Sequence, residues 1–180
     1  VHIRQRHDSV AAYFGRSSLS SCARLKDREG VAFANNVLGY IHYVNYRNDS
    51  ALYYFEKAYQ TRKELGLVVL SANTLFNMAR AYARLGNYEK ANQALQQVLE
   101  VDRSRKNRGG AVGTLNALGE VALLMKDYPR AKNFLKEAEV EARTLLNRNE
   151  QRNNYRLQAQ WARATGQPDL ANEYYEKYIA

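Results

Sequence analysis

The sequence contains a single cysteine and only two prolines, and both scarcities restrict what the chain can be. Cys22 cannot form an internal disulfide, which fits a reducing compartment and predicts a cytoplasmic location. Two prolines, Pro129 and Pro168, are few for a fold rich in β-strands, which needs many turns, whereas long helices need few helix-breaking residues. No apolar run approaches the roughly 18–20 residues of a membrane-spanning helix. The N-terminal VHIRQRHDS also lacks the apolar core of a signal peptide, so we expect no membrane association.

Residues that could catalyse a reaction or bind a metal are few and scattered. The histidines His2, His7 and His42 share no metal-ligand spacing with Cys22 or with an acidic cluster. His42 occupies the repeat position of Tyr82, which favours a packed side chain, and burial is favoured over reactivity for Cys22. No glycine-rich phosphate loop is present. We therefore predict no metal, no cofactor, no catalytic residue and no enzymatic activity.

The net charge is +9, which raises the question of nucleic acid binding. The basic residues are spread along the chain without a basic tail, so a mildly basic, solvated surface is the favoured interpretation. The segment 103–113 is basic and contains glycine, and we expect a solvated loop there. A helical solenoid that binds nucleic acid through its basic surface remains the alternative function.

Several residue types recur with a period of 40 residues. Alanine stands at five such positions: Ala11, Ala51, Ala91, Ala131 and Ala171. Twelve residues before the last four of them lie small residues: Gly39, Ala79, Gly119 and Ala159. Four residues after the last four lie large residues: Phe55, Leu95, Leu135 and Tyr175. Such a period is the sequence signature of a repeat architecture.

Apolar residues within each repeat follow helical spacing, as in Leu75, Met78, Ala79 and Tyr82. Gly86–Asn87 interrupts the pattern before a second apolar stripe, and the small residues let two helices approach closely. The sequence therefore predicts an all-α fold of tandem antiparallel helix hairpins. The expected helices span residues 10–25, 30–46, 48–64, 68–85, 87–104, 111–126, 128–146, 151–165 and 168–180.

These columns resemble the tetratricopeptide repeat, which has a small residue, an alanine and a large residue at its eighth, twentieth and twenty-fourth positions. The family's Leu–Gly pair recurs at Leu38–Gly39 and Leu118–Gly119. The period of 40 exceeds the family's roughly 34 residues, the family tryptophan is missing from its column, and no proline closes a repeat. We expect the additional residues to fall between hairpins, at 26–32, 66–72 and 106–112. Such lengthened repeats are similar to those of bacterial peptide-responsive regulators and signalling proteins.

The resemblance implies a right-handed solenoid forming one repeat domain over residues 1–180. It would contain a partial repeat at 1–31 and repeats at about 32–71, 72–111, 112–151 and 152–180. Residues 1–9 align with the tail of a preceding helix, so we interpret the chain as part of a longer protein.

The resemblance also implies a peptide-binding groove on the first helix of each hairpin. The expected groove residues are Phe33, Asn36, Tyr40, Tyr43, Asn73, Phe76, Asn77, Arg80, Arg84, Asn116, Glu120, Asn153, Arg156 and Arg163. In similar repeat receptors, asparagine amides at these sites pair with a peptide backbone, although they could instead bridge neighbouring helices. The arginines suit carboxylates or form a solvated face, and the aromatic residues form a floor or pack between repeats.

We therefore predict a module that binds a protein or an extended peptide, with an acidic ligand favoured by the arginines. It would serve as the sensing or scaffolding part of a bacterial signalling or regulatory protein. A third hypothesis is that the chain is a scaffold that associates with itself.

Overall fold

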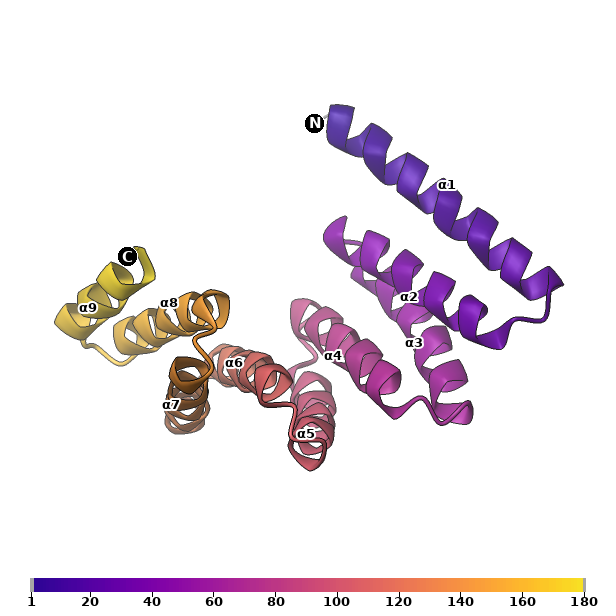
Figure 1. The fold of residues 1–180 in the computed structure, drawn as a ribbon. Coiled ribbons are helices and arrows are strands. Elements are labelled where there is room, and N and C mark those ends of the chain that lie inside the picture. Colours follow the sequence, from indigo (N-terminus) through magenta and orange to yellow (C-terminus); the bar gives the residue numbers. More distant parts are fainter. Residues whose placement is uncertain (1, 180) are drawn as a thin grey trace. The chain divides into compact units, whose positions relative to one another are not determined.

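The computed structural model describes the backbone of residues 2–179 and the side chains of residues 10–179. Within these residues the chain forms nine α-helices and no strand, which confirms the all-α prediction (Figure 1). The helices are α1 His2–Arg24, α2 Arg28–Val44, α3 Asn48–Glu64, α4 Val68–Arg84, α5 Tyr88–Ser104, α6 Arg108–Leu124, α7 Tyr128–Thr144, α8 Arg148–Ala164 and α9 Pro168–Ile179. None of them is both long enough and apolar enough to cross a membrane.

The connections between helices are nearly identical. Each helix from α3 onward begins 20 residues after the previous one, and three residues join consecutive helices. The middle residue of each turn has a positive φ, whether it is a glycine such as Gly86 (79°) or a larger residue such as Leu146 (51°). In the first turn, the Asp27 amide donates to the Cys22 carbonyl and the Lys26 amide donates to the Ala23 carbonyl. This pair of backbone bonds satisfies the carbonyls at a helix end, and it recurs in the other turns.

The period of 40 lengthens helices, not loops, which corrects the sequence-based expectation. Of the segment 26–32, only residues 26 and 27 lie in a turn, and the same holds in 66–72 and 106–112. The segment 103–113, expected to be a loop, is helical except for residues 105–107. The amide of Gly110 donates to the Asn107 side chain, which caps α6 and starts that helix earlier than we expected.

Helix α1 is also longer than the sequence predicts. Residues 2–9 continue into it without a break and do not form the tail of a preceding helix. The physical reason is that neither glycine nor proline interrupts the chain before Gly15, so nothing stops helix propagation there.

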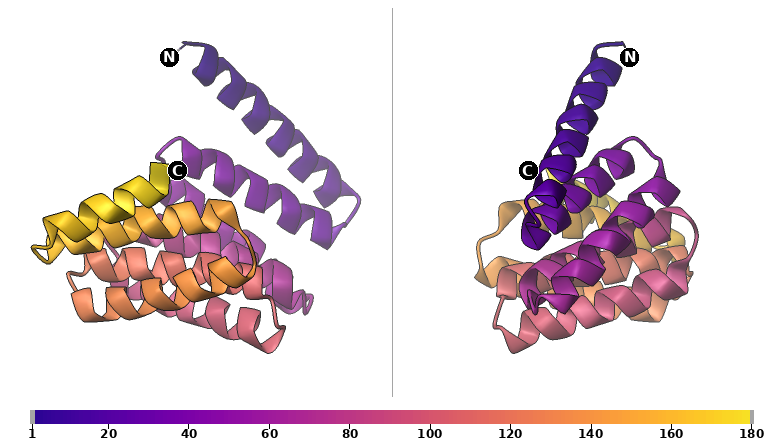
Figure 2. Two further views of the ribbon diagram at one scale, coloured as in Figure 1. Left: turned by 60° about the vertical axis from the view of Figure 1, so that its left-hand side comes forward. Right: turned by 90° about the vertical axis from the view of Figure 1, so that its right-hand side faces the viewer.

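The chain divides into two compact units, Val1–Ala94 and Leu95–Ala180, and the boundary falls within α5. A single repeat domain over residues 1–180 stays a prediction. In the first unit, α1 packs against α2, and α3 packs against both α2 and α4. In the second unit, the hairpins α6–α7 and α8–α9 pack through α7 and α8, which Figure 2 shows from two further sides.

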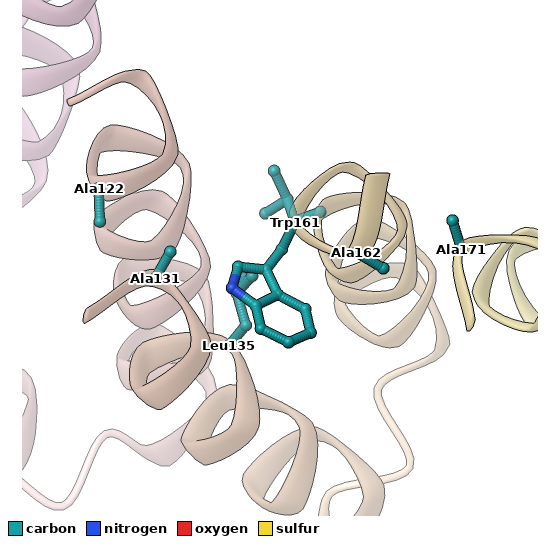
Figure 3. Packing of buried hydrophobic residues seen from close by; sticks show 7 residues of the cluster. Ala122, Ala131, Leu135, Trp161, Ala162 and Ala171 are labelled. Atoms are coloured by element: carbon teal, nitrogen blue, oxygen red, sulfur yellow. The ribbon is translucent and has the colours of Figure 1, made fainter. Parts of the chain in front are cut away.

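The predicted small-residue columns form the core of both units. Ala51, Ala91, Ala131 and Ala171 are all at most 1% exposed. A Cβ added at Gly39 would lie 2.5 Å from the Phe55 ring, so the close crossing of α2 and α3 requires glycine there. The core of the second unit is built around Leu135 and Trp161, and Figure 3 shows the indole reaching from α8 toward Leu135. The prediction that these columns lie at helix–helix contacts is confirmed.

Candidate functional site

One face of the first unit carries nine of the expected groove residues. We call this face, made by α2 and α4, the α2–α4 surface. It comprises Phe33, Asn36, Tyr40, Tyr43, Asn73, Phe76, Asn77, Arg80 and Arg84. Their spacing of three, four and seven residues places them along one side of each helix. Phe33 and Tyr40 are 61% and 50% exposed, whereas Tyr43 is buried.

Two arginines of α4 lie over the buried Tyr43. The guanidinium carbon of Arg84 is 3.7 Å from the centroid of the Tyr43 ring, and that of Arg80 is 4.9 Å away. Arg84 also donates from Nη1 to the Tyr43 carbonyl oxygen at 2.7 Å. Tyr43 therefore packs between helices, as the alternative interpretation of the aromatic residues held, whereas Phe33 and Tyr40 remain open to solvent.

The arginines of this surface have no acidic partner among the side chains of residues 10–179. In the described part of the chain, no carboxylate lies within ion-pair distance of Arg80 or Arg84. A guanidinium has five donors, and stacking on a ring uses none of them. The surface can therefore offer charge-assisted hydrogen bonds to an incoming anion.

Of the three asparagines on this surface, Asn73 is exposed, and Asn36 and Asn77 are half-buried. The Oδ1 atom of Asn36 is buried and accepts no hydrogen bond. The side chain of Asn77 is half-buried, and no hydrogen bond to it is formed within residues 10–179. A buried acceptor without a partner costs on the order of 1–3 kcal/mol, so Asn36 is an unsatisfied polar group beneath this surface.

Asn116 does not face an accessible groove, and the prediction for this residue is wrong. Its side chain is fully buried between α6 and α8. Its amide donates to the Glu150 carboxylate at 2.9 Å, and its Oδ1 accepts from Asn154 at 2.8 Å. Because these partners saturate the carboxamide, Asn116 bridges helices, which is the alternative that the sequence left open.

The remaining predicted residues of the second unit pair with one another or stand alone. Arg156 lies 3.6 Å from the Glu120 carboxylate and donates to the Asn153 side chain at 2.9 Å. Arg163 is exposed on the same helix. Glu120, Asn153 and Arg156 therefore satisfy part of one another's bonding, and they offer less to a ligand than the residues of the α2–α4 surface.

A buried polar network in the second unit was missed by the sequence analysis. Asn154 donates to both Asn116 and the Leu135 carbonyl, and it accepts from Gln158 at 2.5 Å. Gln158 also donates to Glu139. One signal was available, since Asn154 falls in a column with Thr74 and Thr114, all three of which are buried.

Thr74 and Thr114 form hydrogen bonds at equivalent positions, but one hydroxyl accepts from a cation and the other donates to an anion. The buried Arg62 donates to the Thr74 hydroxyl at 2.6 Å. Forty residues later, the Thr114 hydroxyl donates to the buried Asp102 at 3.0 Å. Burial lowers the pKa of Arg62, and the charge of Glu29 partly offsets this effect. These contacts tie the second helix of one hairpin to the first helix of the next.

The described residues form no cluster suited to binding a metal ion. They contain no group of three or more histidine, cysteine, aspartate or glutamate side chains that could hold a metal ion. The His42 ring stacks on Tyr54 with centroids 5.2 Å apart, and burial, followed by the charges of Arg47 and Arg16, lowers its pKa. Cys22 is half-buried. The side chains of His2 and His7 lie outside the described residues.

The sequence and fold resemble known repeat proteins. Residues 17–104 match the tetratricopeptide repeat family. No curated protein sequence matches the chain.

Solved structures extend the likeness to almost the whole chain. BtubC (BKLC) from P. vanneervenii is 18% identical with a TM-score of 0.86, and the match covers 99% of this chain and 75% of that one. Aspartyl phosphate phosphatase F from Bacillus subtilis is 21% identical with a TM-score of 0.83, over 93% and 44% of the two chains. The Rap conjugation gene regulator of plasmid pLS20, in complex with the Phr* peptide, is 15% identical with a TM-score of 0.77, over 84% and 43%. At these identities the likeness is one of fold, and it confirms tandem hairpins of the tetratricopeptide type.

Proposed function

We propose that the chain, which matches the tetratricopeptide repeat family over residues 17–104, binds a protein or an extended peptide. We further propose that it acts without catalysis, as the sensing or scaffolding part of a cytoplasmic signalling or regulatory protein. The complex of the Rap regulator with the Phr* peptide supports this proposal, because the two chains share a fold.

The α2–α4 surface is the part of the chain that we assign to binding. The observation that carries this assignment is the pair of arginines over Tyr43, neither of which has an acidic partner in the described residues. An acidic side chain of the peptide would bond to Arg80 and Arg84, and an apolar one would cover Phe33 and Tyr40.

The peptide backbone has its own partners on this surface. The carboxamides of the exposed Asn73 and the half-buried Asn77 can both donate and accept. An extended peptide presents such groups at regular intervals, so hydrogen bonds to its main chain supply affinity independent of sequence.

A peptide library that varies acidic and aromatic positions, followed by calorimetry, tests the assignment. Asn77→Ala should weaken the best ligand by about 1–3 kcal/mol, because bound backbone groups lose a buried partner. Arg80→Ala should weaken acidic ligands more than neutral ones and lessen the salt dependence. Arg148→Ala, which replaces an exposed arginine at the start of α8 outside every predicted site, is the matched control and should change neither. Unchanged affinity in both Asn77→Ala and Arg80→Ala would remove the α2–α4 surface as the binding site.

The net charge of +9 keeps nucleic acid as the second candidate. Fluorescence anisotropy with random duplex and single-stranded DNA separates the two functions. A steep loss of affinity with salt for either nucleic acid, without any peptide ligand from the library, would favour the basic solenoid. A molecular mass that rises with concentration in light scattering would instead favour the self-associating scaffold.

A further inference from the structure

The second unit contains a cavity that the α2–α4 surface does not include. It has a volume of about 300 Å³ and lies between α7 and α9, with α8 as its floor. Leu135, Trp161, Leu170 and Tyr174 give it apolar and aromatic walls. The Trp161 indole donates to the Tyr128 carbonyl at 3.0 Å, which fixes the ring as one wall of the cavity (Figure 3). A cavity of this size with aromatic walls suits a small planar group.

The charges around the cavity are not balanced. Lys132 and Lys136 line it from α7, and both are exposed. The Lys132 ammonium is 5.1 Å from the centroid of the Trp161 ring. No carboxylate lies within ion-pair distance of either lysine in the described part of the chain. The free charge at the rim is therefore positive.

The one carboxylate in the cavity wall is already neutralised. Glu139 accepts from Arg143 at 2.6 Å and from Gln158 at 3.1 Å. Burial raises the pKa of the neighbouring Tyr174, and the charge of Glu139 adds to this effect. Because Glu139 has its own cation, Lys132 and Lys136 remain available to a ligand.

A gap in the first unit has a different lining. It lies over α2 between α1 and α3, and its lining contains no aromatic side chain. The aromatic walls are therefore a feature of the cavity between α7 and α9 that the gap over α2 lacks.

We propose that the cavity between α7 and α9 binds an aromatic group that carries a carboxylate. The ring would lie against Trp161, Leu170 and Tyr174, and the carboxylate would bond to Lys132 and Lys136 at the rim. This chemistry is present in a free aryl acid and in an aromatic side chain next to an acidic one in a peptide. The site is separate from the α2–α4 surface and does not depend on peptide binding there.

Trp161 is the only tryptophan in the chain, so its emission reports directly on this cavity. Phenylacetate should change the emission saturably with a Kd on the order of 1 mM, as expected for a ligand of so few atoms. Phenylacetamide, the uncharged isostere, should bind about tenfold more weakly. A capped dipeptide of aspartate and phenylalanine, compared with one of asparagine and phenylalanine, tests the peptide source in the same way. The better binder of the two carboxylates identifies the source.

The double variant Lys132→Gln/Lys136→Gln should weaken both carboxylates about tenfold and leave the amides unchanged. Lys57→Gln in the first unit, whose ammonium also lies over an aromatic ring, is the matched control and should have no effect. The indole N–H resonance of Trp161 in NMR spectra gives a second readout that does not depend on emission. Equal binding of carboxylate and amide, or no saturable change in either readout, would overturn the proposal.

Discussion

Arg84 contacts both the side chain and the backbone of Tyr43 and so joins two consecutive hairpins. Its guanidinium carbon lies 3.7 Å from the centroid of the Tyr43 ring, and its Nη1 donates to the Tyr43 carbonyl oxygen at 2.7 Å. Tyr43 is near the end of α2 and Arg84 is the last residue of α4, so the contact fixes the ends of both helices. Arg84 is therefore a structural residue of the α2–α4 surface as well as a candidate ligand-binding one.

Replacing Arg84 should lower stability as well as binding. Arg84→Ala removes the cation–π contact and the bond to the Tyr43 carbonyl, and should destabilise the fold by about 1–2 kcal/mol in chemical denaturation. Arg80→Ala loses only the more distant stacking contact, so its cost should stay below about 1 kcal/mol. Equal stabilities of the two variants would contradict the structural role of Arg84.

The asparagines of the repeats should separate into two classes on mutation. Asn154→Ala removes the buried hydrogen bonds to Asn116, Leu135 and Gln158, and should cost roughly 2–4 kcal/mol. Asn77→Ala lies on the α2–α4 surface and should change stability by less than about 0.5 kcal/mol. Thermal and urea unfolding of both variants measure the difference. A destabilisation by Asn77→Ala as large as that by Asn154→Ala would show that Asn77 is also structural.

Asn35 offers a route to a more stable protein. Its Nδ2 donates to the Val31 carbonyl, while its buried Oδ1 has no partner and borders a cavity of about 450 Å³. Leu75 and Leu115 occupy the same repeat position. Asn35→Leu should therefore raise the free energy of unfolding by about 1–2 kcal/mol, because it removes an unsatisfied acceptor and adds apolar contacts.

Asn35→Ala is the control for this effect, since it removes the acceptor without filling the space. Its stability should fall between that of the parent and that of Asn35→Leu. If Asn35→Leu is less stable than the parent in differential scanning calorimetry, the cavity is too tight for the larger side chain.

The turns allow a matched pair of substitutions. Leu146 has a φ of 51° and is 83% exposed, so glycine there relieves backbone strain while losing little buried surface. Leu146→Gly should stabilise the fold by roughly 0.5–1 kcal/mol. Gly86→Ala places a Cβ in open space at a φ of 79°, so its expected loss of about 1 kcal/mol is purely conformational. Urea unfolding that shows changes of the same sign for both variants would contradict this account.

Much of the fold could be predicted from sequence because the repeat fixes which residues must be small. Ala51, Phe55 and Gly39 form one contact, and the same three columns recur in each hairpin. The starts of α6 and α8 were placed three residues too late. For α6, Gly109–Gly110 reads as a break in the sequence but occupies the first helical turn, where glycine costs little.

The candidate site was less predictable. A residue's position in the repeat determines which side of the helix its side chain lies on, but not whether that side chain is buried. Asn36 and Asn116 share one column, yet only Asn36 keeps an unpaired oxygen. Asn116 is covered because Glu150 and Asn154, from the next hairpin, supply its partners. Such contacts depend on residues about 34–38 positions away and on side-chain rotamers. The repeat period of the sequence specifies neither.

The identical turns have a consequence for how this kind of chain can change its length. Each turn is closed by backbone hydrogen bonds and one left-handed residue, so the junction does not depend on which side chains flank it. Joining residue 86 to residue 127 would remove 40 residues, the helices α5 and α6, and connect α4 to α7 through a turn of the same geometry. Whole hairpins can therefore be lost or duplicated by recombination without a new connection having to evolve. The surfaces they carry are then free to diverge one hairpin at a time.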